Sequence, residues 1–293
     1  MNDELMELIR GSGNVFADMR QGNADAHQIK ALLAAEIIKA LDADGLSVRK
    51  AHARTGIAAP DFSRIRNGDL GRFTIDRLIN THHHWDHTAG NGVFQPATVK
   101  IVAHENVPGL QRAAAARQPA QPGMPGPDEQ VVATVTYKDT WREDVGGETV
   151  ALKYYGPAHT GGDSVVTFEK ANVVHMGDLV FNRRHPFIDR PGGASIAGWI
   201  KVLEGTMADH GADTIYVFGH AGPQWPVTGA RADLAYMRDY LAALVDHVRA
   251  EMKAGKPRDA IVKATEPLKG FSDHGPLIER VLTAAYEELA PQP

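Results

Sequence analysis

The chain has 293 residues, with 31 Lys and Arg against 36 Asp and Glu, so its formal net charge is −5. Hydrophobic residues make up 43% and charged residues 23% of the sequence, which is typical of a folded chain with one large or two modest domains and excludes a disordered, fibrous or nucleic-acid-coating protein. There is no cysteine, which excludes a disulfide framework, a thiolate zinc finger, an iron–sulfur cluster and a cysteine nucleophile. Any metal must therefore bind to histidine and carboxylate side chains.

The first residues, MNDELMELIR, are acidic and lack the basic and apolar parts of a secretory signal. No run of 18 apolar residues occurs in the sequence, so a membrane-spanning helix is not expected. We therefore predict a cytoplasmic protein with no membrane partner.

Residues 1 to about 80 read as helices. The segment from 27 to 43 has apolar residues at spacings of three and four, which predicts a helix with a buried stripe that ends at Gly45. The stripe consists of Ile29, Leu32, Leu33, Ala35, Ile37, Ile38 and Leu41. Ser47 can cap a second helix, and a turn at Gly56 leads to a third helix that begins near Pro60 and ends before Gly68.

The third helix is expected to expose Ser63, Arg64, Arg66 and Asn67, whose side chains are of the kinds that contact base edges and phosphates. Two short helices joined by a glycine-containing turn form a helix-turn-helix layout. The stretch LSVRKAHARTGIAAPDFSRIRNGDLGRFTIDRLI resembles the Xre-type helix-turn-helix domains of repressors and antitoxins, over roughly residues 14 to 79. The resemblance implies DNA as a partner, whereas the alternative interpretation is a solvated helical hairpin.

The second half is richer in strands and predicts an α/β domain. Short β-branched and aromatic runs alternate with helical stretches at 197–209, 231–253 and 277–289; the runs are VKIVAH, VVATVTY, TVALKYY, SVVTF, NVVHMGDLVF and TIYVF. The segment from 117 to 130, rich in proline and glycine, is predicted to be a surface loop, either a connector or a lid over a site.

A histidine-rich motif, INTHHHWDHTAGN, follows an apolar run that can form a strand. It has the pattern H-x-H-x-D-H. Side chains two residues apart on an extended segment point the same way, so His82 and His84 can bind one ion while Asp86 and His87 reach a second. His83 is expected to be a spacer that points away. Three further candidate ligands end later strands, namely His159, Asp178 and His220.

With these residues, the segment from about 75 to 290 resembles the metallo-β-lactamase-fold hydrolase superfamily. The resemblance implies an αβ/βα sandwich in which His82, His84 and His159 hold one metal, Asp86, His87 and His220 hold a second, and Asp178 bridges the two. All seven positions are filled. Since Asp stands at the bridging position, the set is more similar to the glyoxalase-II, lactonase and phosphodiesterase-like branches than to the cysteine-containing β-lactamases.

Two such cations lower the pKa of a bridging water, which can then attack an electrophilic carbonyl or phosphorus. We expect two Zn²⁺ ions per chain, with iron (Fe) or manganese (Mn) as alternatives, and a small-molecule substrate with an ester, lactone or amide bond, β-lactams included. The resemblance implies that Asp86 also acts as a catalytic proton acceptor. Arg183, Arg184 and His185 are candidate substrate contacts, or else part of a solvated loop. Thr160, Asp163 and Ser164 are candidates to fix imidazole tautomers.

The predicted domains are a helical domain at 1–74 and a hydrolase domain at 75–293. The hydrolase domain appears without the family's first strands, because the helical domain takes their place ahead of the motif. An exposed sheet edge would result. A homo-oligomer, which we expect, or a strand exchange would cover it; if the sheet is left incomplete, the motif survives but activity is weak or lost. The favoured hypothesis is a zinc-dependent hydrolase; the alternative is a DNA-binding regulator with a metal-binding or sensory C-terminal domain.

Overall fold

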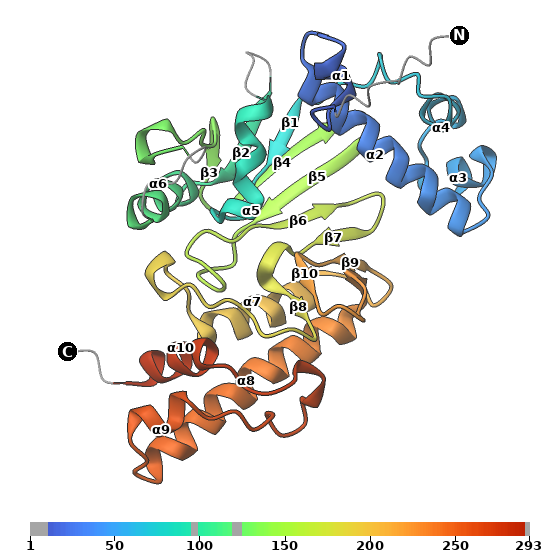
Figure 1. Cartoon of the computed structure of the whole chain (residues 1–293). Coiled ribbons are helices and arrows are strands. Elements are labelled where there is room, and N and C mark those ends of the chain that lie inside the picture. Colours follow the sequence, from blue (N-terminus) through green and yellow to red (C-terminus); the bar gives the residue numbers. More distant parts are fainter. Residues whose placement is uncertain (1–10, 95–98, 119–124, 291–293) are drawn as a thin grey trace, which may run out of the picture. The chain divides into compact units, whose positions relative to one another are not determined.

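The computed structural model describes residues 11–94, 99–118 and 125–290. The chain forms two compact units (Figure 1). The first unit comprises Met1–Asp76 and Gly92–Val99, and the second comprises Arg77–Asn91 and Lys100–Pro293.

The first unit is helical, as the sequence predicts. Its helices are α1 (Val15–Asp18), α2 (Ala24–Ala43), α3 (Val48–Thr55) and α4 (Ala59–Arg66). The hydroxyl of Ser47 accepts a hydrogen bond from the amide of Lys50 at 3.3 Å, which caps α3. Gly56 ends α3 with a φ of 74°, a left-handed conformation that glycine adopts without strain.

The core of the first unit is small, and the predicted stripe on α2 is largely wrong. Leu41, Ala51 and Phe62 form the buried cluster. Leu32 and Leu33 are each 56% exposed, and Ile37 is also exposed. Phe62 of α4 packs against Leu41 at the C-terminal end of α2, so the buried contact with α4 lies at that end of the helix and not along the predicted stripe.

The second unit contains two main sheets. The first is parallel, in the order β1-β2-β3, and the second has the order β11-β9-β7-β6-β5-β4. A short parallel pair, β10-β8, is not hydrogen-bonded to the described strands of either sheet. The strands are β1 (Arg77–Ile79), β2 (Lys100–His104), β3 (Val135–Tyr137), β4 (Thr140–Val145), β5 (Glu148–Lys153), β6 (Val165–Phe168), β7 (Val173–His175), β8 (Phe181–Asn182), β9 (Ile215–Val217), β10 (His220–Ala221) and β11 (Thr228–Gly229).

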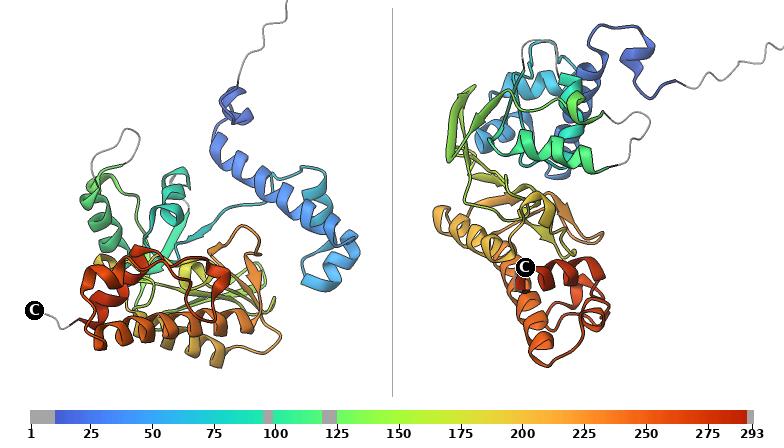
Figure 2. Two further views of the ribbon diagram at one scale, coloured as in Figure 1. Left: turned by 60° about the horizontal axis from the view of Figure 1, so that its bottom comes forward. Right: turned by 90° about the vertical axis from the view of Figure 1, so that its left-hand side faces the viewer.

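Helices connect and cover these sheets. They are α5 (Trp85–Thr88), α6 (Val107–Arg117), α7 (Ile196–Asp209), α8 (Arg231–Lys253), α9 (Arg258–Val262) and α10 (Glu279–Leu289). Short 3-10 segments are η1 (Ala89–Phe94), η2 (Pro127–Glu129), η3 (Gly177–Leu179), η4 (Arg190–Gly192) and η5 (Ser272–His274). Helices α7 and α8 pack against each other beside the six-stranded sheet (Figure 2).

Two apolar clusters hold this unit together. The smaller one joins the sheets and includes Val102 of β2 and Leu152 of β5. The larger one lies between the six-stranded sheet and the helices and includes Trp199 and Leu203 of α7. Consecutive residues of β6, Val165 and Val166, belong to different clusters, because alternate side chains of a strand point to opposite faces. The result is a layered sandwich of sheets and helices.

The structure confirms most of the predicted strands and helices of this unit. It adds β4 and α6, which the sequence analysis did not single out. The predicted 117–130 loop contains the end of α6 and the turn η2, and its residues 119–124 lie outside the described part of the chain. Within the described ranges, no helix is long and apolar enough to cross a bilayer. One described strand, β1, precedes the histidine motif; the absence of further family strands remains a prediction.

Candidate metal centre

The histidine motif begins where β1 ends and continues into α5. The Asn80 amide donates to the carbonyl of His87 at 3.1 Å, and the side chains of Asn80 and Asn91 exchange hydrogen bonds at 2.9 and 3.0 Å. Asn91 in turn donates to the carbonyl of Val131 at 2.8 Å. These bonds hold the turn between β1 and α5 in one conformation, which fixes the backbone that carries the motif.

The other predicted ligands come from connections that end near this turn. His159 lies between β5 and β6, Asp178 lies in η3 directly after β7, and His220 opens β10 shortly after β9. Strands β7 and β9 are parallel neighbours, so the residues that follow them emerge at the same edge of the sheet.

One group of potential metal ligands brings together His82, His84, His159 and Asp178. The Nδ1 atom of His84 lies 2.9 Å from Nε2 of His82 and 3.0 Å from Nε2 of His159. The Oδ2 atom of Asp178 lies 3.5 Å from Nε2 of His159 and 3.9 Å from that of His82. The three rings are packed roughly edge to face, so their nitrogens converge on one point.

A second group brings together Asp86, His87, Asp178 and His220. The Nε2 atom of His220 lies 3.1 Å from Oδ2 of Asp86 and 3.2 Å from Oδ2 of Asp178. The Nε2 atom of His87 lies 3.1 Å from Oδ1 of Asp178 and 3.4 Å from Oδ2 of Asp86. Asp178 therefore belongs to both groups, and the structure gathers all seven residues that the sequence analysis singled out.

Close backbone packing holds the Asp178 carboxylate in place. Asp178 is 4% exposed, and a Cβ atom at Gly219 would overlap its Oδ1 atom, so only glycine fits there. Although burial alone would raise it, hydrogen bonds from His220 and His87 hold the pKa of Asp178 well below its usual range. The same bond to Asp178 raises the pKa of His220. Asp178 is thus an anion shared between the two groups.

Burial has the opposite effect on the first group of histidines. It lowers the pKa of His82, and it lowers the pKa of His159 to about 3 despite the nearby Asp178 charge. Both rings are therefore neutral at pH 7 and offer nitrogen lone pairs, which is the form that binds metal ions.

The donor set fits divalent cations. It contains imidazole nitrogens and carboxylate oxygens, and neighbouring donor atoms lie 2.9 to 3.9 Å apart. Such spacings suit ligands that each stand about 2.0–2.2 Å from a common ion. In addition, the Asp178 carboxylate oxygens lie 3.1 to 3.9 Å from ring nitrogens of four histidines. A buried carboxylate in such surroundings is stabilised by a cation.

The hydrogen bond that orients His159 comes from a residue that the sequence analysis did not propose. The Nδ1 atom of His159 donates to the carbonyl of Phe187 at 2.7 Å, which leaves Nε2 unprotonated. The expected candidates have other partners: Asp163 accepts from the amide and hydroxyl of Thr160, both at 2.7 Å, and Ser164 accepts from Tyr137. Burial raises the pKa of Asp163 to about 7.

His83 does not behave as a simple spacer. It is 2% exposed, and its Nε2 atom lies 3.2 Å from Oδ2 of Asp189. The same oxygen lies 3.0 Å from Nε2 of His84. Asp189 could not be recognised from the sequence, because it is separated by 105 positions from His84 and belongs to no metal-binding motif.

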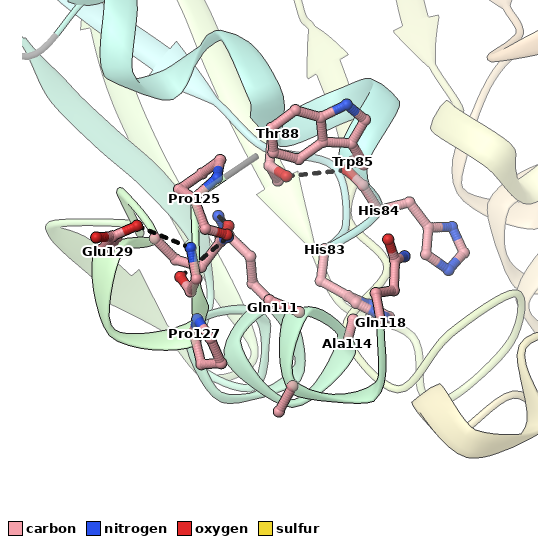
Figure 3. A pocket seen from close by; sticks show the side chains of 14 residues that line it. His83, His84, Trp85, Thr88, Gln111, Ala114, Gln118, Pro125, Pro127 and Glu129 are labelled. Atoms are coloured by element: carbon pink, nitrogen blue, oxygen red, sulfur yellow. Dashed lines mark hydrogen bonds between the residues drawn. The ribbon is translucent and has the colours of Figure 1, made fainter. Parts of the chain in front are cut away.

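A cavity of about 390 Å³ lies beside the motif (Figure 3). His83, His84 and Trp85 lie on one side of it, and Pro125 and Pro127 lie on the other. The remaining lining comes from alanines and glutamines of α6 and its continuation and from Thr88, Gly126, Glu129 and Gln130. Among the lining residues that the structure describes, Glu129 is the one Asp, Glu, Lys or Arg, and its carboxylate accepts a hydrogen bond from the Gly126 amide at 3.0 Å.

The three predicted substrate contacts have different environments. Arg183 forms an ion pair with Asp233 and stacks over the ring of Tyr236. His185 is buried, and its ring nitrogens lie 2.7 Å from the Tyr240 hydroxyl and 2.8 Å from the Pro276 carbonyl. These contacts favour a packing role for both residues. Arg184 is exposed, and its positive charge acts on His220.

The predicted DNA contacts lie on α4 and just after it. Ser63 and Asn67 are exposed, whereas both arginines are half-buried and paired. Arg64 lies 3.0 Å from Asp61, and Arg66 lies 2.8 Å from Asp42. Both arginines thus already have an aspartate partner.

Comparison with known proteins identifies the family of the chain. A model of the metallo-beta-lactamase superfamily matches residues 51–245 of the chain. The chain belongs to the metallo-beta-lactamase superfamily. The match begins within α3 of the helical unit, whereas the resemblance noted in the sequence begins near residue 75.

Two curated relatives of this superfamily member are similar over part of their length. A 2,4-dinitroanisole O-demethylase subunit alpha from Nocardioides sp. (strain JS1661) is 30% identical over 125 residues, which are 42% of this chain and 35% of that protein. A hydroxyacylglutathione hydrolase from Maricaulis maris (strain MCS10) is 28% identical over 131 residues, which are 43% of this chain and 42% of that protein. The matched segment thus spans less than half the length of either relative.

The fold also matches a solved structure. A stereoselective inverting sec-alkylsulfatase from Pseudomonas sp. superposes with a TM-score of 0.56 at 17% identity, over 80% of this chain and 44% of that one. At this identity the likeness concerns the fold alone. Together with the family match, it supports a metallo-beta-lactamase-type α/β fold with helices at the N-terminus.

Proposed function

We propose that this chain is a metal-dependent hydrolase that binds two divalent cations, with zinc as the favoured metal and iron or manganese as alternatives. The observation that carries the proposal is the position of Asp178, whose carboxylate is shared by two groups of donor atoms. His82, His84 and His159 would hold the first cation, and Asp86, His87 and His220 the second. A bound pair of this kind supplies Lewis acidity and an activated water for hydrolysis.

The residues around the two groups have distinct roles in this proposal. Burial keeps His82 and His159 neutral, so they bind a cation instead of a proton. The side chain of Asp86 is 53% exposed and lies at the outer side of the second group, 3.1 Å from His220. An exposed carboxylate beside the reacting bond can take up a proton and pass it to a leaving group. We therefore propose Asp86 as the catalytic proton acceptor.

Of the seven proposed ligands, His84 alone lines the cavity beside Trp85, so we propose that the cavity receives a part of a small-molecule substrate next to the reacting bond. Its alanine, proline, tryptophan and glutamine side chains suit a neutral group with apolar and hydrogen-bonding parts. We propose that this group belongs to an ester, lactone or amide whose carbonyl faces the donor groups. One curated relative is a hydrolase by name, which agrees with this reaction class.

Turnover with a panel of chromogenic ester, lactone, β-lactam and phosphodiester substrates tests the proposal. We expect hydrolysis of at least one carbonyl substrate, its loss on treatment with a chelator, and its recovery on addition of zinc. Asp86→Ala should lose this activity. Asp246→Ala on α8, where the carboxylate side chain is 73% exposed and paired with Arg249, is the matched control and should keep it. Activity that survives the chelator, or survives in Asp86→Ala, would contradict the proposal.

Two possible partners are a second copy of the chain, which we propose, and DNA. Strand β1 is the end strand of its sheet, and a second copy of the chain is the partner that we expect at that edge. Light scattering on the full chain would show a dimer or larger assembly if this is right and a monomer if it is wrong. DNA binding by the first unit is not favoured, because Arg64 and Arg66 are already paired with aspartates.

A further inference from the structure

His84 presents its two ring nitrogens to different surroundings. Its Nδ1 atom faces Nε2 of His82 at 2.9 Å and Nε2 of His159 at 3.0 Å. Its Nε2 atom faces Oδ2 of Asp189 at 3.0 Å. A neutral imidazole carries one N–H, so the partner of one nitrogen decides whether the other has a free lone pair. For a metal ligand this choice determines whether binding can occur.

Asp189 is placed to accept a hydrogen bond from the ring N–H of His84. It is 5% exposed, and its Oδ1 atom accepts a hydrogen bond from the amide of Gly192 at 3.0 Å. An ionised carboxylate has no proton to donate. The His84–Asp189 contact therefore requires the N–H of His84 to be at Nε2, which leaves Nδ1 free to face the first group.

We propose that Asp189 is a positioning residue of the first metal site, which fixes the tautomer and the ring orientation of His84 so that its Nδ1 atom binds the ion. This inference rests on the proposed function only in that a divalent cation binds there. Asp189 itself does not contact the ion.

The loop that carries Asp189 is braced from the C-terminal helix. Arg190 donates to the carbonyl of Ala194 at 2.6 Å and to Glu288 of α10 at 2.9 Å. Glu288 also accepts from the amide of Ile196, at the start of α7, at 2.7 Å. These bonds limit the freedom of the loop, so the carboxylate is held in place before a metal binds.

Close packing on the other side of Asp189 adds to this restraint. The amide of Gly161 donates to the carbonyl of Gly192 at 2.8 Å, and a Cβ atom at Gly192 would overlap the Asp189 carboxylate. Gly192 thus permits an approach that any larger residue would prevent.

His83 shares the same carboxylate oxygen. Its Nε2 atom lies 3.2 Å from Oδ2 of Asp189, in a position where the ring is almost fully buried. Neither ring nitrogen of His83 has a hydrogen-bond partner among the described residues, so we assign the positioning role to Asp189 alone. The competing arrangement is a third cation held by His83, His84 and Asp189, whose donor atoms lie within 4.8 Å of one another.

The test is metal binding by the full chain and by two variants, Asp189→Ala and Asp189→Asn. Zinc affinity of each site is measured by competition with a chromophoric chelator, and the ions are counted by elemental analysis. We expect Asp189→Ala to weaken the first of two ions about 10- to 100-fold and to leave the second unchanged. Asp189→Asn keeps one acceptor oxygen, so its affinity for the first ion should lie between those of the native chain and Asp189→Ala. In the cobalt-loaded proteins, the absorption of the first site should change more in Asp189→Ala than in Asp189→Asn.

Asp209→Ala is the matched control, because Asp209 is paired with Lys153 and Tyr155 at the end of α7 and contacts neither group of donors. It should bind both ions as the native chain does. An unchanged first site in Asp189→Ala would overturn the positioning role alone. Equal weakening of both sites, with a lower melting temperature of the metal-free protein, would show that Asp189 only supports the fold and would also overturn it.

Two further results are decisive. Three ions in the native chain, reduced to two in Asp189→Ala, would make Asp189 a ligand and overturn the positioning role. A native chain that binds no zinc would contradict both this inference and the proposed function. Binding of two ions without turnover on any substrate would contradict the proposed hydrolase and leave the role of Asp189 to be decided by the affinities.

Discussion

The two units of this chain both gather charged and polar side chains, but they do so in opposite ways. On α4 the arginines are matched by aspartates, as in the pairs Arg64–Asp61 and Arg66–Asp42. In the second unit, ring nitrogens of four histidines converge on the buried carboxylate of Asp178. Arginines that are already paired offer little to an anionic ligand, whereas burial keeps His82 and His159 neutral beside a buried anion, an arrangement that favours a bound cation.

Substitution of the candidate metal ligands should have the largest effect on bound metal and on activity, so it tests the contrast between the two units most strongly. Asp178→Ala removes a donor from both groups, so it should lose both ions, whereas His220→Ala removes a donor from one group and should lose one. The fall in kcat/KM of Asp178→Ala should exceed the roughly 100-fold loss that is typical when only a supporting residue is removed. Elemental analysis and steady-state kinetics measure these effects. Retention of two ions by Asp178→Ala would show that it is not shared.

Truncation of an apolar side chain should cost more unfolding free energy in the second unit than on α2 of the first. Leu203 is fully buried in the large cluster, so Leu203→Ala should lower the free energy of unfolding by about 2–5 kcal/mol. Leu33 on α2 is 56% exposed, so Leu33→Ala should change it by less than about 0.5 kcal/mol. Denaturant unfolding followed by circular dichroism measures both. A large loss for Leu33→Ala would indicate that its face is covered in the folded protein.

The pH dependence of stability offers a test away from the metal groups. Burial, with the nearby His185 and Arg183 charges, lowers the pKa of His274 to about 3. The folded protein thus favours neutral His274, and its contribution to stability is present above about pH 6.5 and decreases as the pH falls from there toward 3. The decrease is at most about 1.4 kcal/mol per pH unit.

His274→Phe preserves the stacking on Tyr240, whose ring lies 4.1 Å away, and removes the titrating group. Its unfolding free energy should depend less on pH between 4 and 6.5 than that of the native chain, whereas its value at pH 8 should be similar. Parallel pH profiles for the two proteins would contradict a neutral, buried His274.

The smallest effect is expected on α4. Arg64→Ala with Arg66→Ala breaks two partly exposed ion pairs, so the free energy of unfolding should fall by no more than about 1 kcal/mol per pair. Hydrolysis should be unchanged. If the native chain retarded a DNA duplex in a gel and this double variant did not, the first unit would be a working DNA-binding domain, and the comparison drawn above would fail.

Much of the metal centre could be predicted from the sequence, because its candidate ligands lie in one short motif and directly after predicted strands. His82, His84, Asp86 and His87 lie within six positions, and His159, Asp178 and His220 each follow a strand. The helix boundaries of the first unit were equally accessible, since Ser47 and Gly56 act through neighbouring backbone atoms.

Features that depend on distant parts of the chain were not predictable. Asp189 reaches His84 across the fold, and the carbonyl of Phe187 that orients His159 leaves no trace in residue type. Likewise, the apolar spacing on α2 indicates a helix, but it does not tell whether another element covers Leu32 and Leu33. The pairing of Arg66 with Asp42 joins two helices and also required the three-dimensional structure.

The central claim is that the two groups of donors around Asp178 bind two divalent cations that hydrolysis requires. The most direct measurement is to count the metal ions in the purified full chain by elemental analysis and to assay the same sample on the substrate panel with and without a chelator. The account predicts close to two ions per chain and turnover that the chelator removes. Fewer than one ion per chain after incubation with zinc, together with no turnover, would contradict it.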